Sequence, residues 1–86
     1  MRELEKILKA LANRRRLAII KHLKTHQPAS VGEIAATIKL SFRSTSKHLA
    51  VLASADIVER EQSGLQIFYF LTPTPSRALR TLLKLV

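Results

Sequence analysis

The stretch over residues 30–52 constrains the fold most, because it holds the start signals of two short helices close together. Ser30 is a candidate N-cap, and Glu33 follows three residues later, which is the spacing of a capping box. Apolar side chains then recur at helical intervals. Ser41 is a second candidate N-cap, for a helix over residues 42–54. The stretch therefore predicts two short helices joined by a tight turn.

The second of these helices combines an apolar face with a face rich in hydrogen-bond donors. Thr45, Leu49 and Leu52 are spaced four and three apart and form the predicted core face. The remaining positions of the first turns carry hydroxyls and cations, without a carboxylate. The major groove of DNA admits one helix and offers acceptors to such donors. We therefore predict a recognition helix over about residues 41–54; the alternative is an ordinary solvated basic face. The candidate DNA contacts on this helix are Ser41, Phe42, Arg43, Ser44, Ser46, Lys47 and His48.

The charge balance also favours a polyanionic partner. The 86 residues include 15 basic and 6 acidic side chains, for a net charge of +9. Nucleic acid is the first candidate partner and an anionic membrane surface the second. The absence of cysteine excludes disulfides and thiolate metal or redox sites. No apolar run is long enough to span a membrane, and the N-terminus does not look like a secretory signal. We expect one small domain over residues 1–86, located in the cytoplasm.

Two further helices are predicted before this motif. An apolar stripe at helical spacing predicts an amphipathic helix over residues 2–11. Asn13 is the candidate N-cap of a second helix, which should run from Arg14 to about His26. Gln27 and Pro28 should end it.

A β-hairpin is predicted after the recognition helix. Two strand-like runs flank Ser63 and Gly64, which are residue types typical of tight turns. Asp56 precedes the first strand and is a candidate for a left-handed backbone conformation. Arg60, Ser63 and Gln66 are candidate DNA contacts on this hairpin. The predicted fold class is mainly α with a small β-hairpin: a winged helix-turn-helix with about five helices and a two-stranded wing.

The last helix is predicted to be a dimer contact. Thr74 is its candidate cap, with Pro75 in the first helical position, where proline is tolerated. Its apolar stripe either docks on the core of the chain or packs against another chain, and we favour a homodimer interface shared with the first helix. The predicted interface residues are Leu4, Ile7, Leu8, Leu79, Leu82, Leu83 and Val86.

Most of the chain, from Leu8 to Leu71, resembles the ArsR-type winged-helix repressors. The matching positions are Asn13, Arg16, Leu17, Ile20, Ser41, Ser44, Ser46, His48, Leu49, Leu52, Gly64, Tyr69 and Leu71. The resemblance implies a homodimeric transcriptional repressor with a recognition helix in the major groove and dimer contacts through the first and last helices.

Three departures from the family pattern limit what carries over. The helix before the recognition helix lacks the cysteines of the family's sensing members, and the last helix lacks acidic and histidine ligands. The metal-sensing activity of the family is therefore not expected here, and we expect no cofactor. Phe42 stands where the family usually has a polar base-reading side chain; it either contacts a thymine methyl group or packs inward.

The remaining candidates are basic or histidine side chains. Arg14, Arg15 and Arg16 open a helix, and we expect Arg16 to pair with an acidic residue inside the fold, such as Glu33 or Glu59.

His22 and His26 are four apart, a spacing that can bind a metal, but we favour a surface pair because no third ligand is evident in the sequence. We also find no candidate catalytic set, so an enzyme is not expected. The alternative function is a winged helix that binds proteins, or nucleic acid without sequence preference.

Overall fold

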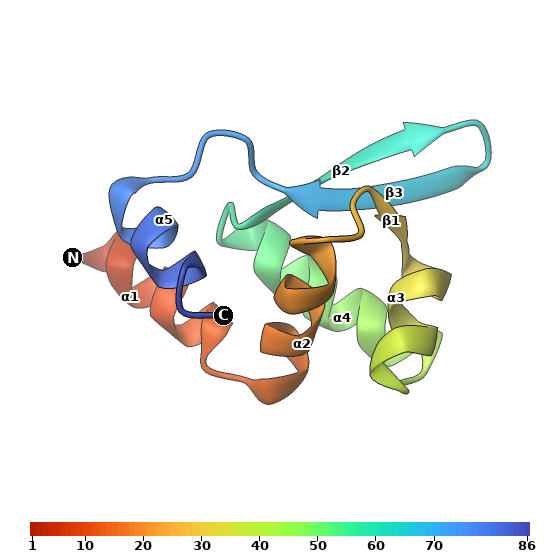
Figure 1. Ribbon diagram of the computed structural model, residues 1–86, viewed down its shortest axis with the longest axis horizontal. Helices are drawn as coiled ribbons and strands as arrows, with labels where there is room; N and C mark the ends of the chain where they lie inside the picture. The colour runs from red at the N-terminus through yellow and green to blue at the C-terminus, as the bar shows by residue number, and fades with distance from the viewer.

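The structure is a computed structural model, and it describes all 86 residues. Five helices and three strands form the molecule (Figure 1). The elements in chain order are α1 (Arg2–Leu11), α2 (Arg14–Leu23), β1 (Ala29–Ser30), α3 (Val31–Ile38), α4 (Phe42–Ser54), β2 (Val58–Ser63), β3 (Gln66–Leu71) and α5 (Arg77–Leu83). The predicted fold class, mainly α with a β-hairpin, is confirmed. No helix of the structure has the length and apolar character that crossing a membrane would require.

Side-chain caps start four of the five helices. The Asn13 side chain accepts hydrogen bonds from the backbone N–H groups of Arg15 and Arg16, at 2.9 and 3.1 Å. The hydroxyls of Ser30 and Ser41 cap α3 and α4, as predicted. Only the serine half of the predicted capping box is present, because the carboxylate of Glu33 lies against His22.

The prediction for the last helix was wrong by two residues. Its cap is Ser76 rather than Thr74, because the Ser76 hydroxyl accepts from the Leu79 N–H at 3.2 Å. The N–H of Thr74 instead donates to the hydroxyl of Thr72, which holds this residue in the linker.

The second helix is shorter than predicted, since α2 ends at Leu23 rather than near His26. Its chain continues as a tightened turn in which the N–H of Thr25 donates to the carbonyl of His22, three residues back. The Lys24 side chain then donates to two carbonyls in and after α5, those of Leu83 and Val86, each at 2.9 Å. This end of α2 therefore supports the last helix.

Two tight turns orient α4. Lys39 adopts the left-handed conformation after α3, with φ of 56°, and its N–H closes the last turn of that helix. Asp56 adopts the same conformation after α4, with φ of 57°, as predicted.

The sheet has one strand more than predicted. The hairpin of β2 and β3 is joined by β1 on the other side of β3, giving the antiparallel order β1-β3-β2. Ala29 pairs with Tyr69, and Ser30 pairs with Phe68. The side chain of Gln27 extends this contact by accepting from the N–H of Leu71 at 2.7 Å. These pairings join segments that are far apart in the sequence. A strand of two residues is too short to show an alternating pattern, so the sequence did not predict it.

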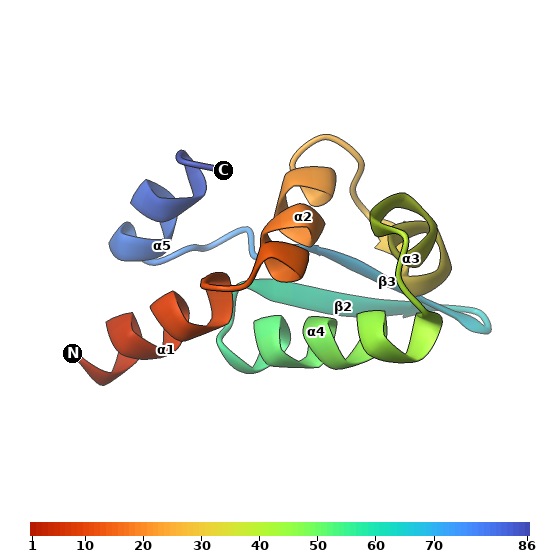
Figure 2. The same ribbon diagram turned by 90° about the horizontal axis from the view of Figure 1, so that it is seen from below.

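The core lies where α1, α2, α3 and α4 meet the inner face of the sheet, and Figure 2 shows α4 lying along one side of this assembly. Fully buried members include Ile20, Leu49 and Leu52. Ile7 and Leu79, predicted for a dimer interface, belong to this core and are only 2 % exposed. They pack α1 and α5 onto the same chain, so they have no surface to offer a second one.

Candidate nucleic-acid interface

The exposed face of α4 carries the strongest candidate DNA contacts. Thr45, Leu49 and Leu52 are fully buried, which turns the opposite side of the helix to solvent. Arg43 and Lys47 are both exposed and lie four residues apart, so they share that side. Two cations on one open helical face can reach base edges or phosphates together.

The N-terminus of α4 adds hydrogen-bond donors and a positive dipole end to this face. Ser41 accepts from the N–H of Ser44 at 3.0 Å, and the first turn holds no acidic residue that would offset the dipole. Ser41 is exposed, whereas Ser44 and Ser46 are half-buried. An anion such as a DNA phosphate is therefore favoured near this end of α4.

His48 lies partly inside the fold, which corrects its prediction as an exposed contact. The guanidinium of Arg16 donates to the carbonyls of Ala10 and Lys9, at 2.6 and 3.3 Å, and lies 3.2 Å from Nδ1 of His48. Because arginine can only donate, Nδ1 must accept, and His48 is held as the neutral tautomer protonated at Nε2. Burial lowers the pKa of His48, and the positive charges of Arg16 and Arg15 lower it further.

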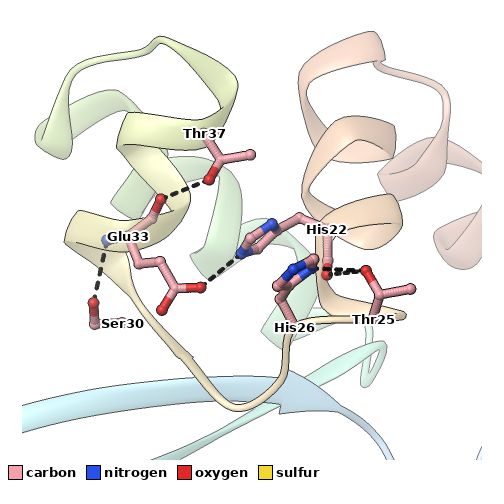
Figure 3. Close-up of polar contacts among 6 residues, drawn as sticks. All are labelled: His22, Thr25, His26, Ser30, Glu33 and Thr37. Carbon is pink, nitrogen blue, oxygen red and sulfur yellow. Dashed lines mark hydrogen bonds and ion pairs between the residues drawn. The ribbon is translucent and has the colours of Figure 1, made fainter.

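Arg16 is therefore a structural residue, but its partners differ from the predicted carboxylates. Glu33 lies instead against His22, at 2.9 Å between Oε2 and Nε2 (Figure 3). Glu59 accepts from the hydroxyl of Thr72 at 2.9 Å. Carbonyl groups at the end of α1 and a histidine of α4 replace them as acceptors for Arg16.

The histidine pair of α2 connects this helix to the first helix of the motif. The rings of His22 and His26 stack with centroids 4.9 Å apart, and Nδ1 of His26 lies 2.8 Å from the Thr25 hydroxyl (Figure 3). Glu33 is thus an acidic neighbour that the sequence did not reveal. No group of three histidine or carboxylate side chains converges so that it could hold a metal ion.

Phe42 points outward, which answers the open question about its packing. Its side chain is 63 % exposed, so it does not belong to the core. It lines a groove of about 640 Å³ between α4, the start of α3 and the hairpin. Ser46 and Ala50 continue the α4 wall, and Leu65, which is fully exposed near the hairpin tip, stands on the other side. Neither the groove nor the position of Leu65 was evident from the sequence.

The hairpin presents different charges on its two faces. Arg60 pairs across the strands with Tyr69, which is buried, and both residues line the groove beside α4. Glu59 and Glu61 flank Arg60 along β2 and therefore point to the other face. The predicted contacts Arg60, Ser63 and Gln66 are all exposed, and Arg60 and Gln66 line the groove.

A second groove lies between α1, α2 and the C-terminal segment. It measures about 340 Å³, and every one of its lining residues is apolar. Leu8 is 45 % exposed there, and Leu85 is 80 % exposed. Of the predicted interface residues, Leu8, Leu82 and Val86 line this groove, while Leu4 and Leu83 are half-buried.

Comparison with known proteins agrees with this arrangement. Residues 11–61 match the family model described as "Helix-turn-helix domain". The chain is 42% identical over 72 residues to the HTH-type transcriptional regulator Rv2034 of Mycobacterium tuberculosis, covering 84% of this chain and 66% of that protein. The matched segment thus spans just under two thirds of the mycobacterial regulator.

Two further relatives extend the comparison to solved structures. The transcriptional activator HlyU of Vibrio cholerae is 38% identical over 77 residues, covering 90% of this chain and 70% of that protein. A structure of HlyU covers 96% of this chain and 86% of its own, with 32% identity and a TM-score of 0.83.

The third comparison is with a solved homodimeric winged helix-turn-helix DNA-binding domain, Mb0332 of Mycobacterium bovis, described as a possible ArsR-family transcriptional regulator. It is 28% identical, with a TM-score of 0.83 over 96% of this chain and 73% of that one. The chain therefore belongs to the ArsR-type winged helix-turn-helix family of transcriptional regulators.

Proposed function

We propose that this chain binds specific sites on double-stranded DNA as a homodimer and thereby regulates transcription. On this proposal, α4 and its cap, over residues 41–54, lie in the major groove, with the first turns of the helix against base edges. The observation that carries the proposal is the shared exposed face of Arg43 and Lys47, opposite the buried side of the same helix. Both side chains can donate to the acceptors of guanine or to phosphates.

Charge supports the same partner. The net charge of +9 attracts a polyanion over distance, and lysines and arginines outside α4 can neutralise phosphates. Arg60 stands at the hairpin wall of the groove beside α4, where it can meet the flanking backbone. Since phosphate contacts release counterions, affinity should fall steeply with salt.

The apolar groove between α1, α2 and the C-terminal segment supports a homodimer. An apolar surface of this kind is stabilised when a second chain removes it from water. The relative Mb0332 is described as homodimeric. Two copies would meet two half-sites about one helical turn of DNA apart. We infer that the dimer represses transcription by occupying promoter DNA. Because its target on this proposal is chromosomal DNA, we also propose that the protein acts in the cytoplasm.

The proposal is tested by selecting bound fragments from a pool of random-sequence duplex DNA at two salt concentrations. We expect enrichment of a palindromic site at both. Binding without enrichment, lost steeply with salt, would mean that only the positive charge acts, as in a non-specific nucleic-acid binder. The absence of binding at low salt would contradict the proposal and favour a protein-binding winged helix, for which the exposed Phe42 offers a contact.

Single substitutions on the selected site test the role of α4. Arg43→Ala or Lys47→Ala should each weaken binding roughly 5- to 150-fold, as expected for loss of a specific base contact or a strong phosphate contact. Lys84→Ala is the charge-matched control, because Lys84 is the C-cap of α5, and α5 and α4 lie on opposite sides of the molecule (Figure 2). Equal effects of all three in a quantitative binding assay would argue against a recognition helix.

A further inference from the structure

Phe42 is the largest apolar side chain exposed on α4, and nothing in the fold requires it there. It is the first residue of the helix, and the Ser41 cap works through its own hydroxyl and the N–H of Ser44. Leaving most of a phenyl ring in water forgoes the stabilisation that burial would give. Its exposure of 63 % therefore marks a surface that is available to a partner.

The surroundings of Phe42 define what kind of partner fits. Ser46 and Ala50 lie four and eight residues further along α4, on the same wall of the 640 Å³ groove. Arg43 and Lys47 stand beside this wall, on the exposed face of α4, and Arg60 stands across from it. The groove and the exposed face of α4 beside it thus carry cations, and α4 carries no carboxylate, which suits a polyanion that also has an apolar group.

DNA offers one apolar group of this kind in the major groove. Thymine carries a C5-methyl group there, whereas the groups by which the other three bases are recognised are hydrogen-bond donors or acceptors. The N-terminal residues of a recognition helix are those that contact base edges. A phenyl ring at the first position of α4 therefore has a thymine methyl group as its natural contact.

We propose that Phe42 is a specificity-determining residue that reads the C5-methyl group of a thymine in each half-site. This proposal rests on the proposed function, and it assigns part of the DNA-sequence preference of the protein to Phe42. The ring excludes water from the methyl group, while Arg43 and Lys47 supply the polar contacts. A guanine or cytosine at this position would present an unpaired polar edge to the ring, which is unfavourable.

The test uses the DNA site selected with the wild-type protein. Each thymidine is replaced in turn by deoxyuridine, which removes the methyl group and leaves the hydrogen-bonding groups unchanged. We expect one position per half-site at which the substitution weakens wild-type binding about fourfold, the value of one buried methyl-sized group. Replacement in both half-sites should give roughly the product of the two effects.

Two variants assign the effect to Phe42. Phe42→Ala should bind the thymine and uracil sites equally, because it has lost the ring. Phe42→Leu is the matched control and should keep a preference for thymine, because it keeps an apolar side chain. Both variants should keep the thermal midpoint of the wild type, since Phe42 lies outside the core.

The outcomes separate this proposal from the proposed function. Sequence-specific binding with equal wild-type affinity for every uracil-containing site would overturn the methyl contact and leave the DNA-binding function intact. A thymine preference that persists in Phe42→Ala would also overturn it, by assigning the contact to another residue. Failure to select any site would overturn both.

Discussion

Arg16 joins three parts of the chain through one guanidinium group. It donates to the carbonyls of Lys9 and Ala10 in the last turn of α1, and its Nη1 lies 3.2 Å from Nδ1 of His48 on the recognition helix. Hydrogen bonds from a charged donor are stronger than those between neutral groups. Arg16 therefore fixes the distance between α1, where the proposed dimer contact lies, and α4, where DNA is proposed to bind.

The partly buried position of His48, beside the positive charges of Arg16 and Arg15, should make stability depend on pH. The folded state lowers the pKa of His48 below its ordinary value of 6.5. Between the lowered value and 6.5 the unfolded chain binds more protons than the folded chain, so the free energy of unfolding falls as the pH drops through this window. We expect His48→Gln, whose amide oxygen can still accept from Arg16, to show a smaller fall in denaturant titrations at several pH values. An unchanged pH slope in the variant would contradict this role of His48.

At the scale of elements, α3 and α4 form one unit through turns and caps that lie close in sequence. Lys39 closes α3 in a left-handed turn, and Ser41 opens α4 two residues later. The pair of His22 and Glu33 ties α3 to α2 (Figure 3). The orientation of the recognition helix thus depends on both its local cap and the helices behind it.

The two serine caps offer a matched test of this arrangement. Ser30→Ala and Ser41→Ala each remove a hydroxyl that accepts from the backbone N–H three residues later, at 3.2 and 3.0 Å. Each should lower the free energy of unfolding by about 1 kcal/mol. Only Ser41→Ala should also weaken DNA binding markedly, because it frays the end of α4 that meets the bases. Equal losses of affinity in both variants would mean that stability alone limits binding.

At the scale of the whole molecule, the two proposed binding surfaces are separate. The chain measures 37 Å along its longest axis, with α1 and α5 at one end and the hairpin tip at the other (Figure 1). A dimer formed through the α1 and α5 end would leave the recognition helix and hairpin of both copies free. The proposed dimer contact and the proposed DNA contact therefore do not compete for the same surface.

A charge placed in the apolar groove should separate the dimer without unfolding the chain. Leu8→Glu changes a residue that is 45 % exposed, and its burial between two copies would desolvate a carboxylate. We expect the dimer dissociation constant to rise roughly 100-fold, which corresponds to about 2.8 kcal/mol. Leu65→Glu is the control, because Leu65 is fully exposed near the hairpin tip. The oligomeric state of each variant is measured by analytical sedimentation. If both variants kept the oligomeric state of the wild type, the proposed dimer interface at the apolar groove would be contradicted.

The sequence by itself determined the existence of the helices, three of their caps and the hairpin, because these depend on contacts within a few residues, whereas the end of α2 and the cap of α5 differ from the prediction. The Ser30, Ser41 and Asn13 caps and the buried face of Thr45, Leu49 and Leu52 follow from spacing along one helix. The exposed pair Arg43 and Lys47 follows from the same periodicity.

Only the tertiary structure decided which side chains meet across the chain. In the folded chain β1 pairs with β3, Arg16 contacts His48, and Glu33 contacts His22. Ile7 and Leu79 are buried in the core of the same chain. The physical reason is distance in sequence: these contacts form only when separate elements pack, and a periodic pattern shows that a face is apolar but not what covers it. The exposure of Phe42 was decided in the same way, by the groove that α4 forms with the hairpin.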